Sequence, residues 1–283
     1  MISDITLGQF FPGESILHRL DPRTKILLST VFIVAVFVAS TPFAFLLVTL
    51  FTAFLMAISG IRASVILKGI KPILLILLFT SIINILMTRG EGDPLVAFWI
   101  IKIYKEGLIR AFFMTLRVIL LIIGTSLLLT YTTSPISLTD GLESLLSPLE
   151  KLHIPVHIFS MMMTIALRFI PTLVEETEKI MNAQKSRGAD FSSGNLIKRA
   201  KALIPLLIPL FASAFKRAEE LAVAMECRCY RVDKKRTKMT HRKMTVVDWL
   251  SLFLIAVFLA VVIVSTTVTP GEDMFSKLAF YKV

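Results

Sequence analysis

The strongest constraint on the fold of this chain is a long stretch without charge near its start. No Asp, Glu, Lys or Arg occurs between Lys25 and Arg62, which leaves 36 consecutive uncharged residues. As a single α-helix this stretch would be about 54 Å long, whereas the hydrocarbon core of a bilayer is about 30 Å thick. Thr41-Pro42 near the middle supplies a break. The stretch therefore predicts two transmembrane helices, at Ile26–Ser40 and Phe43–Ile61.

Three more apolar segments complete the predicted membrane domain. They run over Pro72–Thr88, Ala111–Tyr131 and Trp249–Val268. The whole chain is 55% hydrophobic and only 18% charged, whereas soluble domains have about 25% charged residues. We therefore predict an all-α, polytopic membrane protein with five transmembrane helices. The apolar patch Leu95–Ile101 is too short to cross and is expected at the membrane interface.

Two shorter apolar stretches leave the number of spans open. Leu152–Leu167 has 16 residues and Ala202–Phe215 has 14, below the roughly 20 that a crossing needs. We expect both to pack against the membrane domain or to enter it partway, and a seven-span alternative stays open. The predicted parts are N-terminal transmembrane helices in 1–134, cytoplasmic or membrane-apposed helices in 135–245, and a last transmembrane helix with an outer tail in 246–283.

Basic residues predict the orientation. Four precede the first span and three lie between the second and third: His18, Arg19, Arg23 and Lys25, then Arg62, Lys68 and Lys71. Because Lys and Arg are enriched on the cytoplasmic side of membrane proteins, the N-terminus is predicted in the cytoplasm of a multi-pass cell-membrane protein. Four crossings bring the chain back to the cytoplasm before residue 135, and the fifth leaves the C-terminus outside.

Most of the net charge of +11 comes from one block. From Glu178 to Lys243 there are 16 Lys and Arg residues against 6 Asp and Glu. A basic block beside a membrane is typical of a cytoplasmic loop, and anionic lipid headgroups attract it. Nucleic-acid binding is the rival interpretation, but no nucleic-acid motif accompanies the charge. The lipid bilayer is therefore an expected partner, and nucleic acid is not.

Two amphipathic helices with the same plan are predicted around this block. The first is expected to start at Pro171 and to end at Arg187 and Gly188, because proline favours helix starts and glycine favours helix ends. The second is expected to end near Arg228. Glu176 and Arg217 are assigned to the charged faces, opposite the apolar ones. Several alanines, including Ala183 and Ala224, would let a groove wall or another helix approach closely.

The motifs of catalysis and metal binding are missing from the sequence. There is no Gly-x-x-x-x-Gly-Lys-Ser/Thr phosphate loop, no Gly-x-Ser-x-Gly and no His-Glu-x-x-His. Cys227 and Cys229 supply only two thiols, and Pro155 disturbs the face shared by His153 and His157. We therefore predict no catalytic residue, cofactor or metal site. Two polar residues inside the spans, Asn84 and Arg117, are expected to form hydrogen bonds between helices.

Two short arginine motifs stand at the predicted helix ends. The first is Ala183-Gln184-Lys185-Ser186-Arg187-Gly188, and the second is Ala224-Met225-Glu226-Cys227-Arg228. Together with Gly8–Ser15, Leu17–Lys25 and Leu167–Pro171, they resemble the transmembrane T component of energy-coupling-factor (ECF) ABC transporters, the EcfT/CbiQ-type family. The second departs from the family pattern, because cysteines stand where small residues or glycine are common.

This resemblance implies a coupling subunit that is not an enzyme. It would join two cytoplasmic ABC ATPase subunits to a small substrate-binding membrane (S) component, for uptake of a vitamin or a transition-metal ion. The implied ATPase-docking residues are Ala183, Arg187, Gly188, Ala224, Glu226 and Arg228. The alternatives are a membrane-embedded enzyme, which would need carboxylates or histidines inside the membrane, and a self-contained channel or secondary carrier, for which inverted repeats are expected.

Overall fold

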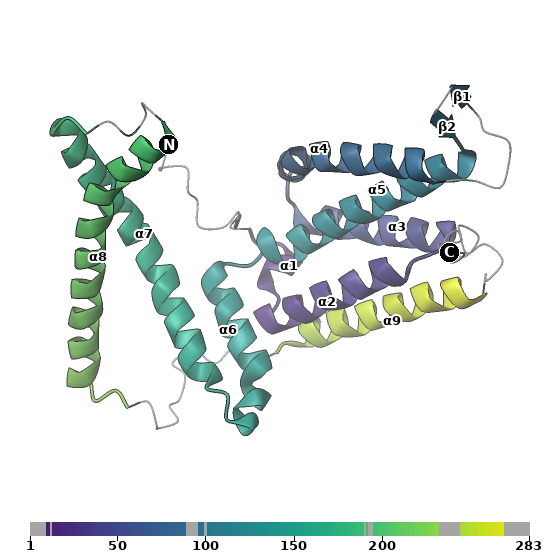
Figure 1. Ribbon diagram of the computed structural model, residues 1–283. Helices are drawn as coiled ribbons and strands as arrows, with labels where there is room; N and C mark the ends of the chain where they lie inside the picture. Colours follow the sequence, from purple (N-terminus) through teal and green to yellow (C-terminus); the bar gives the residue numbers. More distant parts are fainter. Residues whose placement is uncertain are drawn as a thin grey trace. The chain divides into compact units, whose positions relative to one another are not determined.

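The computed structural model describes residues 10–11, 13–88, 96–98, 101–189, 191, 195–231 and 244–268. These residues are almost entirely helical, and a hairpin of two three-residue strands is the exception (Figure 1). The predicted all-α fold class is therefore confirmed. The α-helices and strands are α1 (Ile16–Arg19), α2 (Pro22–Val38), α3 (Pro42–Ser59), α4 (Ala63–Met87), β1 (Val96–Phe98), β2 (Ile101–Ile103), α5 (Lys105–Thr125), α6 (Pro135–Leu146), α7 (Val156–Ser186), α8 (Leu196–Cys227) and α9 (Val246–Val268).

Among the described residues, five helices are long and apolar enough to cross a membrane. Four of them, α3, α4, α5 with its π-helical extension Ser126–Thr130, and α9, overlap predicted spans. The start of α4 differs from the prediction: it lies nine residues earlier, so that Lys68 and Lys71 lie within the helix and not between two spans. The fifth is α7, which was predicted as a membrane-apposed stretch followed by a separate helix. The predicted first span corresponds to α2, whose 17 residues give about 26 Å, a little less than the hydrocarbon thickness.

Pro171 does not start a helix, contrary to the prediction, but lies inside α7. The apolar stretch before it and the amphipathic stretch after it form one helix of 31 residues. Likewise α8 runs through Pro205 and Pro209 and includes the predicted stretch Ala202–Phe215. A proline removes one backbone hydrogen bond and tends to kink a helix, but the intact turns on either side can keep the helix continuous.

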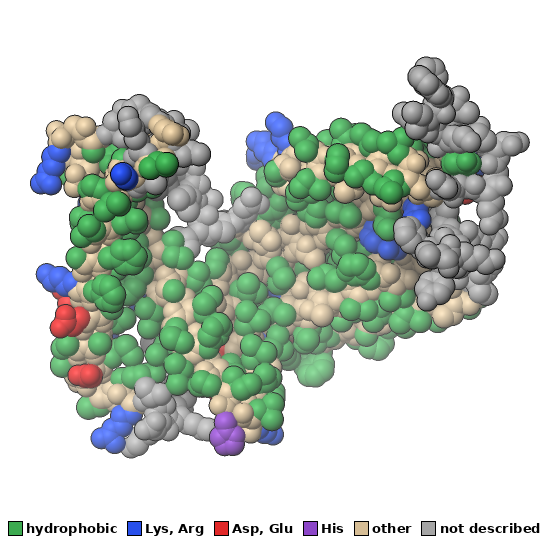
Figure 2. All heavy atoms as spheres, viewed as in Figure 1, with side chains coloured by type: hydrophobic (Ala, Val, Ile, Leu, Met, Phe, Trp, Pro, Cys, Tyr) green, Lys and Arg blue, Asp and Glu red, His purple; other side chains and the backbone are tan. Residues whose placement is uncertain are grey.

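The helices form two compact units, with the boundary inside α6. The first, the helix bundle, contains α1 to α5 and α9. Within it α2 packs on α9, α5 and α3, and α4 packs on α5 (Figure 1). The second, the two-helix unit, contains α7 and α8. Many hydrophobic side chains are exposed over the visible surface of the helix bundle (Figure 2), as expected for helices that face lipid.

Aromatic side chains hold the core of the helix bundle together. Phe32 of α2 is fully buried, and a methyl group added at Gly124 of α5 would overlap its ring. The ring of Phe51 stacks on that of Phe258, with the ring centres 4.1 Å apart. In a bilayer, apolar side chains gain no hydrophobic free energy by moving from lipid to protein. Close van der Waals packing of this kind therefore contributes much of the free energy by which membrane helices associate.

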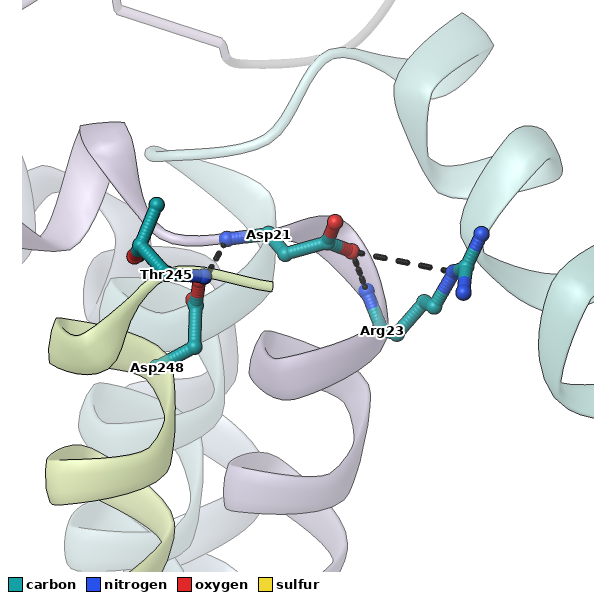
Figure 3. Close-up of polar contacts among 4 residues, drawn as sticks. All are labelled: Asp21, Arg23, Thr245 and Asp248. Atoms are coloured by element: carbon teal, nitrogen blue, oxygen red, sulfur yellow. Dashed lines mark hydrogen bonds and ion pairs between the residues drawn. The ribbon is translucent and has the colours of Figure 1, made fainter. Parts of the chain in front are cut away.

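Two helix N-termini are joined by a single carboxylate (Figure 3). Asp248, 1% exposed, accepts hydrogen bonds from the backbone N–H of Thr245 at 2.7 Å and from its hydroxyl at 2.7 Å, which caps α9. The other carboxylate oxygen accepts from the N–H of Asp21 at 2.9 Å. Asp21 in turn caps α2 by accepting from the N–H of Arg23 at 2.9 Å. The first and last helices of the helix bundle therefore begin at a shared polar contact.

The N-terminal segment, which carries part of the family resemblance, is tied to the end of the π-helical turn. The buried ammonium of Lys25 donates to the carbonyl oxygens of Thr132 at 2.8 Å and His18 at 3.2 Å. The ring of His18 lies 3.0 Å from the carbonyl oxygen of Phe11 and 2.7 Å from the hydroxyl of Ser15. Burial lowers the pKa of His18, and the Lys25 charge adds to this, although the hydrogen bond to Phe11 opposes it. These contacts give the segment a structural role.

Of the two polar residues noted inside the spans, one links helices and the other, among the described residues, bonds within its own helix. The guanidinium of Arg117 in α5 donates to the carbonyl oxygen of Ala39, the residue that ends α2, and lies 5.2 Å from the centre of the Phe45 ring. It therefore satisfies a carbonyl that the helix end leaves without an intrahelical partner. Asn84 instead donates to the carbonyl oxygen of Thr80 in its own helix, so the prediction of an interhelical bond was wrong there.

Candidate docking site

The end of α7 has the geometry of a Schellman motif. The N–H of Gly188 donates to the carbonyl of Lys185 at 2.9 Å, and the N–H of Ala189 donates to that of Gln184 at 3.0 Å. Gly188 has a φ of +88°, a left-handed conformation that glycine adopts without steric cost. Arg187 is the last residue before this turn, and its side chain lies beside the negative end of the helix dipole. The predicted helix end is confirmed.

The end of α8 repeats the motif with a cysteine in place of the glycine. The N–H of Cys229 donates to the carbonyl of Glu226 at 2.8 Å, and the N–H of Tyr230 donates to that of Met225 at 3.0 Å. Cys229 takes the left-handed conformation, with a φ of +56°. Arg228 therefore occupies the same position at its helix end as Arg187 does at the other. The cysteines that depart from the family pattern leave the geometry of the helix end unchanged.

The six candidate residues form two local sets of three, and all six are exposed. Each arginine has an alanine four residues before it, Ala183 before Arg187 and Ala224 before Arg228. Residues four apart share a helix face, so a small side chain lies one turn below each guanidinium. Gly188 forms the turn after the first arginine, and Glu226 lies two residues before the second. The structure does not bring the two sets together, because they belong to different helix ends.

Gly188 and Cys229 occupy the same left-handed position at the ends of α7 and α8. Replacing the glycine and introducing a glycine should therefore have opposite effects on the stability of the two helix ends. Gly188→Ala should loosen the last turn of α7, because a left-handed conformation costs a residue with a Cβ about 1–2 kcal/mol. Cys229→Gly should tighten the last turn of α8 by a similar amount. Hydrogen–deuterium exchange of the last-turn amides measures both, with about fivefold to thirtyfold faster exchange expected in the first variant and slower exchange in the second. Equal exchange in the wild type and both variants would contradict the prediction.

The helices that carry these ends run in opposite directions and pack on each other (Figure 1). Arg187 and Arg228 therefore lie at opposite ends of the two-helix unit. The first half of α8 exposes apolar side chains, and charged side chains appear over its second half (Figure 2). A partner that binds one arginine is therefore well separated along the helix pair from a partner that binds the other.

One polar contact between α7 and α8 was missed by the sequence analysis. We refer to Glu176, Ser213 and Arg217 as the interhelix clamp. The carboxylate of Glu176 accepts a hydrogen bond from the guanidinium of Arg217 at 2.8 Å and a second from the hydroxyl of Ser213. The side chains of Glu176 and Arg217 are 21% and 37% exposed. Both were assigned to charged outer faces. The four-residue spacing of Ser213 and Arg217, which places them on one face, was the available signal.

The polar residues considered for metal binding have other contacts. His157 lies 3.0 Å from the carboxylate of Glu143, which also accepts from the hydroxyl of Ser160 at 2.9 Å. Cys227 and Cys229 are exposed, and neither forms a disulfide in the part of the chain that the structure describes. Within the part of the chain that the structure describes, no three His, Cys, Asp or Glu residues gather in a way that could hold a metal ion. The basic residues of 232–243 lie outside the described residues.

Comparison with known proteins identifies the family. The CbiQ family, described as cobalt transport protein, matches residues 13–239. The protein of Clostridium kluyveri named energy-coupling factor transporter transmembrane protein EcfT is 51% identical over 265 residues, which cover 94% of this chain and 98% of the relative. Proteins of the same name from Ruminiclostridium cellulolyticum and Bacillus subtilis are 53% and 50% identical, and the matches cover 93% and 86% of this chain and 97% and 91% of the relatives.

These relatives are transporter components and not members of an enzyme family, and nothing in the comparisons favours a channel, a carrier or a membrane-embedded enzyme. The matches span almost the whole chain, including both arginine motifs. The five apolar helices make it a membrane-embedded protein. This chain belongs to the EcfT/CbiQ family, the transmembrane components of energy-coupling factor transporters.

Proposed function

We propose that this chain couples two cytoplasmic ABC ATPase subunits to a small membrane protein that captures a vitamin or a transition-metal ion. The observation that supports the proposal most is the pair of matching helix ends. Each end exposes one arginine at the same position of the same backbone motif. Two equal ends suit two ATPase subunits of similar structure, one bound at each end.

The chemistry of arginine suits this role. A guanidinium group donates up to five hydrogen bonds in a fixed planar arrangement, which matches a carboxylate or a group of carbonyls in a groove. The small side chains of Ala183 and Ala224 leave room for the wall of such a groove. Because the arginines lie at the ends of helices, a displacement of either ATPase would act on a helix rather than on a flexible loop.

We further propose that both helix ends and the N-terminus lie in the cytoplasm of a cell-membrane protein, with α2 as the fifth crossing helix and α7 and α8 on the cytoplasmic side. The support is the distribution of charge. Arg62, Lys68 and Lys71 lie in or beside the first turns of α4, and Arg19 and Arg23 flank the start of α2. The excess of Lys and Arg on the cytoplasmic side of membrane proteins predicts that these ends face the cytoplasm.

The two native cysteines allow a direct test of this orientation. Cys227 and Cys229 are exposed and flank Arg228. A maleimide that cannot cross membranes should label them in inside-out vesicles and should fail to label them in intact cells. Thr267→Cys in a Cys227→Ser, Cys229→Ser background is the control, because its position near the far end of α9 should give the reverse pattern. Labelling of Cys227 and Cys229 in intact cells would show the proposed orientation to be wrong.

Co-purification tests the coupling function itself. A tagged copy of this chain should bring two ATPase subunits and one small membrane protein with it from a mild detergent. ATP-driven uptake in proteoliposomes should require all of these proteins. Uptake by this chain alone would instead identify a self-contained carrier, and isolation without any ATPase would contradict the proposal.

A further inference from the structure

The interhelix clamp lies midway between the two arginine ends of α7 and α8. Arg187 follows Glu176 by 11 residues, and Arg228 follows Arg217 by 11 residues. At 1.5 Å per residue, each arginine is about 16 Å along its helix from the clamp. Because α7 and α8 run in opposite directions (Figure 1), the clamp lies between the two arginine ends, at an equal distance from each.

Prolines lie close to the clamp in both helices. Pro171 precedes Glu176 by five residues in α7, and Pro209 precedes Ser213 by four residues in α8. Each proline lacks the N–H that would bond to the preceding turn, so the helix bends most easily there. The segments beyond these prolines, 172–186 and 210–227, carry the two arginine ends. We call these segments the arms.

The polar contact of the clamp joins one arm to the other. Glu176 belongs to the first arm, and Ser213 and Arg217 belong to the second. The two carboxylate oxygens of Glu176 accept hydrogen bonds from Ser213 and Arg217, which lie on successive turns of one face of α8. The contact therefore restrains both the sliding and the rotation of α8 against α7. Hydrogen bonds that involve charged groups are stronger and more directional than neutral ones. The partial exposure of Arg217 moderates this strength.

We propose that the interhelix clamp is a positioning contact that sets the resting distance between the two arginine ends and couples the arms, so that a displacement of one arm is passed to the other. This inference rests on the proposed function of those ends as ATPase-docking sites. When two ATPases approach or separate, joined arms pass the displacement to the rest of the chain. Arms without the clamp bend separately at their prolines, so part of the displacement is lost. Glu176, Ser213 and Arg217 contact neither substrate nor nucleotide in this role.

Spin labels at the two ends measure this distance directly in the full-length chain. One label is placed on native Cys227 in a Cys229→Ser background and the other on Lys185→Cys; both positions are exposed. Glu176→Gln should broaden the narrow distance distribution of the parent protein, and so should Arg217→Gln. Glu176→Arg with Arg217→Glu restores a pair of opposite charges and should narrow it again. Glu175→Gln and Lys216→Gln remove the same charges one residue away and should leave it unchanged.

Transport in proteoliposomes then shows whether the distance matters. Glu176→Gln should retain ATPase binding but reduce the uptake per ATP hydrolysed by about threefold to tenfold. The reason is that loss of a partly exposed charged pair shifts the equilibrium between joined and separate arms by about that factor. The reversed pair should recover most of it. An unchanged distance distribution, or unchanged uptake per ATP, in Glu176→Gln with normal ATPase binding would overturn the clamp proposal. A parent protein that binds no ATPase would instead overturn the proposed function, and the distance measurement is independent of that outcome.

Discussion

Replacing Arg187 and Arg228 together with glutamate should abolish binding of the ATPases while the protein stays in the membrane. Both arginines are exposed at the ends of their helices, so the fold does not depend on them. Breaking a buried, hydrogen-bonded charge contact with a partner costs about 2–5 kcal/mol, or roughly 30- to 5,000-fold in affinity. Pull-down of both ATPases with the tagged variant from detergent, followed by titration of ATPase against it, measures the loss.

A matched variant separates this effect from a change in charge. Lys179→Glu with Lys216→Glu makes the same total change at two exposed positions of the same helices, about 12 Å and about 18 Å along them from Arg187 and Arg228, and it should bind the ATPases as the wild type does. Each single variant, Arg187→Glu or Arg228→Glu, should lose one docking contact and retain the other. Binding of the double variant at wild-type affinity would show that the docking assignment is wrong. Equal loss in the lysine variant would show that only net charge matters.

Replacing Asp248 with alanine should strongly destabilise the helix bundle. Its carboxylate binds the N–H of the buried residue Asp21 and both the N–H and the hydroxyl of Thr245 (Figure 3). A buried donor left without a partner costs about 1–3 kcal/mol, and a lost helix cap costs about 1 kcal/mol. The total of about 2–4 kcal/mol should lower the unfolding midpoint by roughly 5–15 °C.

The midpoint can be measured as the fraction of protein that survives heating in detergent and elutes as a single species from a sizing column. Glu106→Ala is the matched control, because Glu106 is likewise an acidic residue in the first turn of an apolar helix, α5. It should cost less than about 1 kcal/mol, which is the usual contribution of a charge to the helix dipole. A midpoint for Asp248→Ala within a few degrees of the wild type would show that the shared cap does not stabilise the fold.

The two arginine ends show how far local sequence signals reach. Gly188 predicted the end of α7 because glycine adopts the left-handed conformation without strain, and the structure has it there. The same rule does not identify Cys229, since a residue with a Cβ takes this conformation only when the surrounding hydrogen bonds outweigh its cost. In the folded helix end, the N–H groups of Cys229 and Tyr230 donate these hydrogen bonds to the carbonyl oxygens of Glu226 and Met225.

Pro171 and the interhelix clamp show where the local signals failed. A proline is compatible both with a helix start and with a bent helix interior, and the residues nearby do not distinguish the two. The choice in favour of one long α7 depends on packing against α8 and on the apolar turns before the proline. Glu176 and Arg217 were placed on outer faces, because a helix considered alone has no partner that a charged side chain could contact.

The sequence by itself determined that this is a helical membrane protein with two matching arginine ends, because uncharged runs and helix-end residues act over a few turns of one helix. Only the tertiary structure decided that a single carboxylate, Asp248, joins the starts of α2 and α9, and that a clamp joins the arms carrying Arg187 and Arg228. Such contacts connect residues 41 to 227 positions apart. Their partners are set by how the helices pack, and no periodicity within one helix encodes that packing.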